Sequence, residues 1–127
     1  MPRRASAHPT EAELEVLNVL WRRGAGTVRQ VHQALQADRH TSLTTTLKIL
    51  QVMTQKGLTV REANLRPHRY RAALPEERTQ SGLVEDLVQR AFGGSVRKLL
   101  VRAVEDVGLS REELGEIRKV IDGMRKK

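Results

Sequence analysis

The feature that most constrains the fold of this chain is a helical pattern that leads directly into two short alternating runs. The helical spacing extends from Ser42 to Lys56, Gly57 ends it, and the alternating runs 58–63 and 68–72 follow. Glycine commonly ends helices because it adopts the left-handed conformation without strain, and the Asn- and Pro-containing segment between the runs is typical of a turn. A helix followed by a hairpin predicts the second half of a winged helix-turn-helix domain.

The two faces of this predicted helix differ in their chemistry. Successive residues are rotated by about 100°, so residues three and four apart share a face. One face is mainly apolar and should be buried: Leu43, Thr46, Ile49, Leu50 and Met53. The opposite face is polar and contains no acid: Thr44, Lys48, Gln51 and Gln55. Its groups suit base edges and phosphates in a DNA major groove, although an ordinary solvated face would look the same. Thr45 and Leu47 flank it, where their methyl groups could meet those of thymine.

The predicted hairpin is rich in arginine. Alternation along its strands should turn four side chains toward the core: Leu58, Val60, Tyr70 and Ala72. The basic side chains then lie near the rim or the tip: Arg61, Arg66, His68, Arg69 and Arg71. Because arginine binds phosphate oxygens with two parallel hydrogen bonds and can enter a narrow minor groove, we interpret the hairpin as a DNA-contacting wing. The alternative is an edge hairpin whose charges only protect it from aggregation.

Positive charge is concentrated in the half of the chain that contains this helix and hairpin. The 127 residues carry a formal net charge of +8 and a pI of about 10.8, which favour a polyanionic partner, nucleic acid before a membrane surface. Residues 1–74 contain 12 Lys and Arg against 5 Asp and Glu, whereas residues 75–127 contain 11 against 10. This division predicts a nucleic-acid-binding half joined to a half that contacts another protein.

The chain length allows one modest domain, or a small domain joined to an oligomerisation segment. We expect a mainly α fold with a small β-hairpin. Its parts are a flexible basic arm at 1–9, a winged helix-turn-helix DNA-binding domain at 10–74 and a helical dimerisation domain at 75–127.

Capping boxes locate the two helices that precede the predicted reading helix. In a capping box, a hydroxyl and a carboxylate or amide three residues later satisfy the free amides of a helix start, and the spacing occurs at Thr10 and Thr27. The first helix should end at the glycines of 24–26 and the second near 37–38, with 39–42 as the turn and cap of the third. In such a domain the second helix crosses the DNA backbone and the third enters the major groove.

Beyond residue 75 the pattern is purely helical. Helices are expected near 76–92, 95–107 and 110–124, the last opened by a capping box at Ser110. Their apolar positions are more numerous than three separate helices can shield: Leu83, Leu87, Val88, Phe92, Leu99, Leu100, Ala103, Val104, Leu114, Ile117, Ile121 and Met124. We expect them to pack against the same segment of a second chain, since closed two-fold dimers are the commonest oligomers. Packing back onto the chain's own winged domain is the alternative.

Residues that carry catalysis or bind metals are not grouped in this sequence. Cysteine is absent, which excludes disulfides, thiolate nucleophiles and cysteine metal sites and favours a cytoplasmic location. The spacings of a zinc site do not occur among His8, His32, His40 and His68. We therefore expect no enzymatic activity, no metal and no cofactor. Because the sequence has no long apolar segment, we expect the protein to be neither exported nor inserted into a membrane.

Five motifs, in this order, resemble the BlaI/MecI penicillinase-repressor family over about residues 9–123. They are TEAELEVLNVLW at 10–21, TTTLKIL at 44–50, KGL at 56–58, HRY at 68–70 and FGGS at 92–95. The resemblance implies a homodimeric winged-helix repressor that binds double-stranded DNA at a palindromic operator, with the C-terminal helices forming the dimer.

The resemblance also implies modes of release from DNA, and the chain departs from them at named positions. In the best-studied branch, an antibiotic-sensing membrane protease system leads to cleavage just before a phenylalanine that matches Phe92, which abolishes dimerisation. Ala91 stands here where those repressors have asparagine, so Ala91–Phe92 is a candidate cleavage bond that departs from the family pattern. A second branch responds to copper through C-terminal cysteines, and this chain has none. Val52 stands where many members have arginine. Because the chain departs from both patterns of release, the resemblance does not identify the inducing signal.

These patterns together predict a transcriptional repressor. The expected contacts to bases come from Thr44, Thr45, Lys48 and Gln51, with Ser42 on the DNA backbone. The expected wing contacts come from Arg61, Arg66, His68 and Arg69. Two other functions fit a winged helix: a protein-interaction adaptor and a nonspecific architectural DNA binder. Concentration of positive charge in 1–74 disfavours the adaptor, and an aromatic content of 2% disfavours intercalation between bases.

Overall fold

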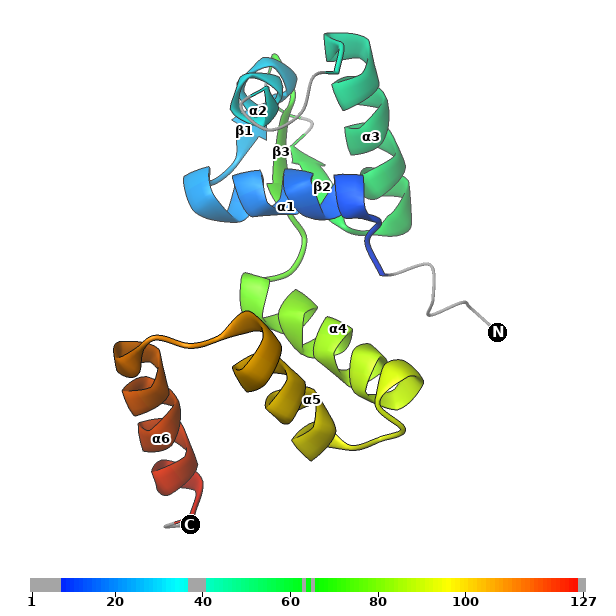
Figure 1. Cartoon of the computed structure of the whole chain (residues 1–127). Helices are drawn as coiled ribbons and strands as arrows, with labels where there is room; N and C mark the ends of the chain where they lie inside the picture. The colour runs from blue at the N-terminus through cyan, green and yellow to red at the C-terminus, as the bar shows by residue number, and fades with distance from the viewer. Residues whose placement is uncertain (1–7, 37–40, 63, 65, 126–127) are drawn as a thin grey trace. The chain divides into compact units, whose positions relative to one another are not determined.

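The structure is a computed structural model that describes residues 8–36, 41–62, 64 and 66–125 (Figure 1). Its elements are α1 (Glu11–Arg23), β1 (Gly26–Thr27), α2 (Val28–Leu35), α3 (Leu43–Lys56), β2 (Thr59–Glu62), β3 (Arg69–Ala72), α4 (Glu76–Ala91), α5 (Val96–Arg102), the π-helix η2 (Ala103–Val107) and α6 (Arg111–Arg125). Helices with one small antiparallel sheet confirm the predicted fold class, a winged helix-turn-helix followed by C-terminal helices.

The chain divides into two compact units, Met1–Leu83 and Val84–Lys127, and the division falls within α4. The predicted domain limits at 74 and 75 stay predictions. Most of the predicted basic arm, residues 1–7, lies outside the described residues. Among the residues that the structure does describe, no helix has both the length and the hydropathy needed to cross a bilayer.

Both predicted capping boxes at the start of the chain are present. Thr10 Oγ1 accepts from the Glu13 amide at 3.2 Å, and Glu13 Oε1 accepts from the Thr10 amide at 2.9 Å. Thr27 and Gln30 exchange the same pair of bonds at 3.2 and 2.9 Å. These bonds satisfy amides that have no partner inside a helix, so α1 and α2 begin where the spacing predicts. The predicted end of the second helix near 37–38, and part of the following turn, lie outside the described residues.

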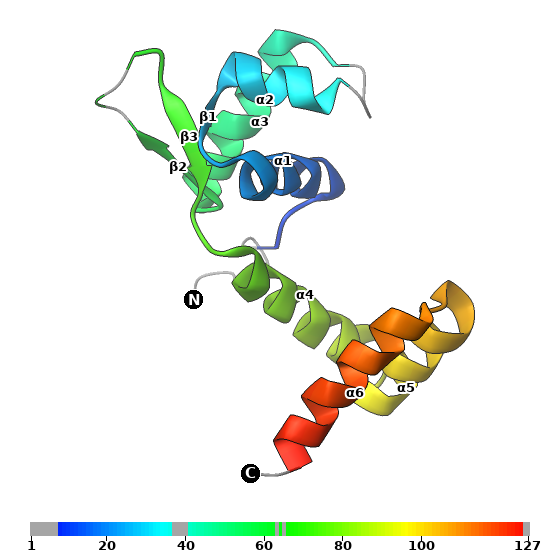
Figure 2. The same ribbon diagram turned by 90° about the vertical axis from the view of Figure 1, so that its left-hand side faces the viewer.

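The core of the first unit lies between its three helices and the sheet, and β2 and β3 stand at the edge of the three-helix group (Figure 2). Ten apolar side chains form it: Val16, Leu17, Val19, Leu20, Val31, Leu35, Leu50, Met53, Leu58 and Tyr70. Among the polar side chains buried with them, Thr46 is hydrogen-bonded to Nδ1 of His32 at 3.0 Å. This bond ties α3 to α2, the helix pair of the helix-turn-helix.

The sheet has three strands rather than the predicted two. β1 pairs with β3 through Gly26 opposite Tyr70 and Thr27 opposite Arg69, so the strand order is β1-β3-β2. Two residues cannot show an alternating pattern, and their sequence predicts only a helix break at Gly26 and a helix cap at Thr27. Their strand conformation depends on pairing with a segment more than forty residues away.

One inward-facing residue of the hairpin was predicted wrongly. Leu58 and Tyr70 are buried and Ala72 packs against the core, as expected, but Val60 is 36% exposed and Thr59 is only 2% exposed. Leu58 lies before the strand, so the alternation begins at Thr59, which faces the same side as its partner Ala72. Burial of the Thr59 hydroxyl is compensated by a 2.9 Å hydrogen bond to the Thr54 hydroxyl.

The second unit contains helices close to the predicted ranges. The predicted helix 95–107 is divided into α5 and the π-helix η2, which the sequence pattern did not indicate. The predicted capping box at Ser110 is present, with Ser110 Oγ accepting from the Glu113 amide at 3.0 Å. Gly93, Gly94 and Gly108 have positive φ angles and separate the helices, as expected.

Candidate nucleic-acid interface

The polar face of α3 is exposed along its whole length. Thr44, Lys48, Gln51 and Gln55 are all exposed, whereas Thr46, Leu50 and Met53 are buried. The predicted division of this helix into a packing face and a solvent face is therefore confirmed. The exposed face carries one cation, two amides and a hydroxyl and no acid, which is the chemistry that hydrogen-bonds to base edges and phosphates.

The first turn of α3 is organised by Ser42. The Ser42 hydroxyl accepts from the Thr45 amide at 3.1 Å and donates to Thr45 Oγ1 at 3.0 Å. Ser42 is thus the N-cap that the sequence predicts, and it also orients the neighbouring hydroxyl. Both residues are exposed at the same end of the helix.

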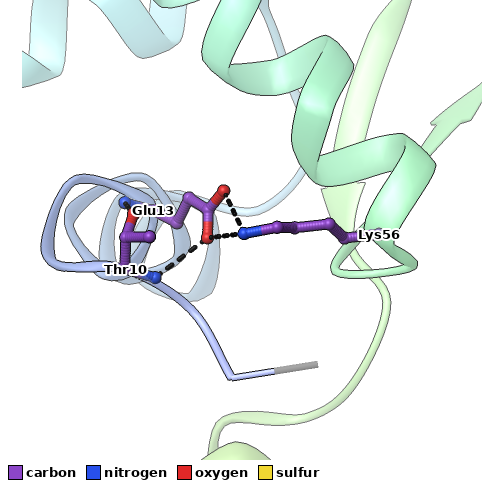
Figure 3. A network of polar contacts seen from close by, with 3 residues as sticks. All are labelled: Thr10, Glu13 and Lys56. Carbon is purple, nitrogen blue, oxygen red and sulfur yellow. Dashed lines mark hydrogen bonds and ion pairs between the residues drawn. The ribbon is translucent and has the colours of Figure 1, made fainter. Parts of the chain in front are cut away.

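The far end of α3 is held against the start of α1 by an ion pair (Figure 3). Lys56 Nζ donates to both carboxylate oxygens of Glu13, at 2.9 and 3.0 Å, and Glu13 is only 5% exposed. The carboxylate also accepts from the Thr10 amide in the capping box. Since the ammonium group is engaged with a buried carboxylate, Lys56 supports the position of α3 rather than extending its exposed face.

The basic side chains of the wing do not lie together. Arg61 faces the same side of the hairpin as its partner Tyr70 and lines a groove against α3 with Gln51 and Gln55. Arg69 and Arg71 alternate with buried Tyr70 and therefore face the other side.

Those two arginines also have protein partners. Arg69 Nη2 donates to the carbonyl of Ala25 at 3.1 Å, and Arg71 Nε lies 3.8 Å from a carboxylate oxygen of Glu62. Arg66 is exposed near the tip. The structure therefore brings Arg61 beside α3 and places Arg69, which was predicted to contact DNA, on the opposite side of the wing.

Two grooves separate α3 from the hairpin. One, of about 800 Å³, is lined by the C-terminal half of α3 and by the strands, with Arg61 among its residues. The other, of about 360 Å³, lies between the starts of α2 and α3 and the wing, and contains Thr44, Leu47 and His68. His68 is half-buried, and its Nδ1 has no hydrogen-bond partner among the described residues. Tyr70 lines both grooves.

Arg29 is a candidate that the sequence analysis missed. It is exposed in the first turn of α2 and lines the second groove, together with Thr44 and His68. Its position after the Thr27 cap was visible in the sequence and places it at the start of the second helix. That the wing closes over this end of α2 depends on the pairing of β1 with β3, which the sequence did not indicate.

Many of the residues predicted for dimerisation are exposed. The exposed ones are Leu87, Leu100, Val104, Leu114, Ile117, Ile121 and Met124, and the half-buried ones are Leu83, Phe92 and Leu99. Every described residue of α6 is exposed. The candidate cleavage bond follows Ala91, the last residue of α4, and the Phe92 amide donates to the carbonyl of Val88 at 3.2 Å, so this bond continues the helical hydrogen bonding.

Comparisons with known proteins agree with this geometry. A profile of the family described as Penicillinase repressor matches residues 9–123. The Transcriptional regulator BlaI of Mycobacterium tuberculosis strain H37Rv is 38% identical over 100 residues, which cover 77% of this chain and 72% of that protein. The Methicillin resistance regulatory protein MecI of Mammaliicoccus sciuri is 21% identical over 113 residues, 89% of this chain and 92% of that protein. MecI of Staphylococcus aureus strain N315 is 20% identical over the same coverage. The chain belongs to the penicillinase-repressor (BlaI/MecI) family of transcriptional regulators, which are not enzymes.

Proposed function

We propose that this chain is a homodimeric repressor that binds a palindromic DNA operator through α3 and the wing of each protomer. The observation that carries the proposal is the exposed, acid-free face of α3 beside an arginine-bearing hairpin, in a member of a repressor family. Helices related by a two-fold axis reach successive major grooves on one side of a duplex when the half-sites are about 34 Å apart. The operator should therefore be an inverted repeat with that spacing.

Within this proposal the contacts to DNA divide by role. Base edges are contacted by Thr44, Thr45, Lys48 and Gln51. Phosphates are contacted by Ser42 at the start of α3 and by Arg61, Arg66 and His68 of the wing. Arg69 contributes positive charge on the other side of the wing, where its guanidinium also donates to Ala25. Phosphate contacts fix position on the duplex, and base contacts select the sequence.

The proposed dimer is supported by the apolar side chains that the second unit leaves exposed. On α6, Leu114, Ile117, Ile121 and Met124 recur at intervals of three and four residues, so they form one stripe along the helix. Their exposed fractions lie between 41% and 69%. A second copy of the same segment would remove this stripe from water, and burial of the exposed half of each such side chain contributes about 1 kcal/mol.

Release from DNA is proposed to follow cleavage of Ala91–Phe92 by a sensor protease that responds to an antibiotic. Such a cut would separate α5 and α6 from the DNA-binding helices and remove the dimer stripe. Immunoblotting of cells before and after β-lactam exposure tests this step. A fragment whose mass corresponds to an end at Ala91 supports it, and derepression with the chain at full length contradicts it.

The experiment that tests the proposed function is DNase I footprinting on the region upstream of the protein's own gene. Protection of two half-sites about one helical turn apart, related by an inverted repeat, is the expected result. A single protected half-site, or no protection at concentrations that saturate random DNA, would contradict the dimeric repressor. Absence of any salt-sensitive DNA binding would instead favour a protein-interaction adaptor.

A further inference from the structure

The two grooves between α3 and the wing suggest where one strand of the DNA backbone lies. A helix in the major groove and a hairpin in the adjoining minor groove must stand on either side of a sugar–phosphate strand, because such a strand separates the two grooves of a duplex. The space between α3 and the β2–β3 hairpin, to which Tyr70 contributes a wall along both grooves, is the place where that strand can pass.

Resting on the proposed function, we infer that these grooves seat the backbone strand and that Arg29 of α2 binds one of its phosphates. Arg29 thereby joins α3 and the wing as a third DNA-contacting part of the domain. It fixes the position of the domain on the duplex and does not read a base.

The charge of the grooves matches this occupant. Each groove contains an arginine, Arg61 in one and Arg29 in the other, and none of the described residues that line them is acidic. His68 lines the same groove as Arg29, and its side chain is half-buried there. A phosphate between these two side chains would accept hydrogen bonds from a guanidinium and from an imidazole, depending on the tautomer of the ring.

Among the described residues, Arg29 is not engaged with another protein group, which distinguishes it from three other cations of the domain. Lys56 is paired with Glu13, Arg71 lies beside Glu62, and Arg69 donates to a backbone carbonyl. Within the part of the chain that the structure describes, Arg29 has no such partner. It also lies in the first turn of α2, where the helix dipole favours an anion.

The test compares Arg29→Ala with Arg22→Ala in the full chain. Arg22 is a matched control because it is also exposed on a helix of the first unit and lines neither groove. Fluorescence anisotropy gives the affinity for the upstream duplex and for a scrambled duplex of equal length across a salt series. Far-UV circular dichroism confirms folding, and Arg29→Gln replaces Arg29→Ala if the alanine variant loses helix content.

Loss of one phosphate contact has a defined signature. Arg29→Ala should weaken binding to both duplexes by the same factor, on the order of tenfold, and reduce the slope of log K against log salt by about 0.9. Arg22→Ala should change neither quantity, and Arg29→Lys should retain the wild-type slope. If Arg29→Ala and Arg22→Ala show the same slope of log K against log salt while the wild type still prefers the upstream duplex, Arg29 does not bind a phosphate. The proposed repressor function is then unaffected. If the wild type shows no preference, the proposed function itself fails.

Discussion

At the residue scale, the proposed sequence preference depends on hydroxyl groups at the start of α3. The Ser42 hydroxyl donates to Thr45 Oγ1, which orients the Thr45 side chain and leaves its own proton and its methyl group for other contacts. Because Thr45 is exposed, those groups can meet a base edge or a thymine methyl without any rearrangement of the helix. The helix itself is positioned by buried contacts elsewhere, so a change at Thr45 should affect recognition and not folding.

Replacement of Thr45 by alanine tests this role. We expect affinity for the upstream duplex to fall about five- to tenfold, since one hydroxyl contact to a base contributes roughly 1 kcal/mol, the lower end of the range for base contacts, with affinity for scrambled DNA unchanged. Anisotropy titrations on both duplexes measure the ratio. Thr79→Ala, the same truncation on α4, serves as the control. An equal loss on both duplexes would show that Thr45 contacts the backbone.

The ion pair between Glu13 and Lys56 should contribute to stability rather than to DNA binding. Lys56→Met leaves the buried Glu13 carboxylate without its cation and should lower the free energy of unfolding by about 1–3 kcal/mol, less than for a fully buried pair because Lys56 keeps 28% of its side-chain exposure. Arg71→Met breaks the exposed contact with Glu62 and should cost less than about 1 kcal/mol. Urea unfolding followed by circular dichroism measures both. Equal effects for the two variants would contradict the assigned role of the buried pair.

At the element scale, the parts that the sequence predicted are those set by local contacts. The boxes at Thr10 and Thr27, the cap at Ser42 and the left-handed Gly57 each involve residues within a few positions, so their spacing alone is informative. The strand β1 and the inward position of Thr59 were missed because they depend on pairing with β3, distant in the chain. Arg29 was missed for the same reason, since only the folded sheet brings the wing to the start of α2.

The dimer is predicted to form through α6, whose apolar stripe is 41–69% exposed. Ile121→Asp places a charge in the centre of that stripe and should raise the dimer dissociation constant at least about a hundredfold. The lost apolar burial and the burial of an unpaired carboxylate both occur twice in a two-fold dimer, and together they cost about 3 kcal/mol or more. Sedimentation equilibrium measures this change. Lys119→Asp, on the opposite face of α6, should leave the dimer intact. Persistence of the dimer in Ile121→Asp would place the interface elsewhere.

At the scale of the whole molecule, charge and apolar surface are divided between the two halves of the chain. Residues 1–74 carry most of the net charge of +8, and the C-terminal helices carry most of the large exposed apolar side chains among the described residues. When a second copy is joined to a domain that binds a polyanion, the second binding event becomes intramolecular. The pair therefore binds more tightly than one copy, provided that the DNA offers two sites at the matching spacing. Recognition of the operator should therefore depend on the dimer, and removal of the second unit should abolish both.

Sequence-specific binding by a dimer can be measured by fluorescence anisotropy of the purified chain with the duplex upstream of its own gene and with a scrambled duplex, across a salt series. The account predicts tight preference for the upstream duplex, saturation at two chains per site, and an affinity that falls steeply with salt on both duplexes. Equal and weak binding to the two duplexes would contradict it.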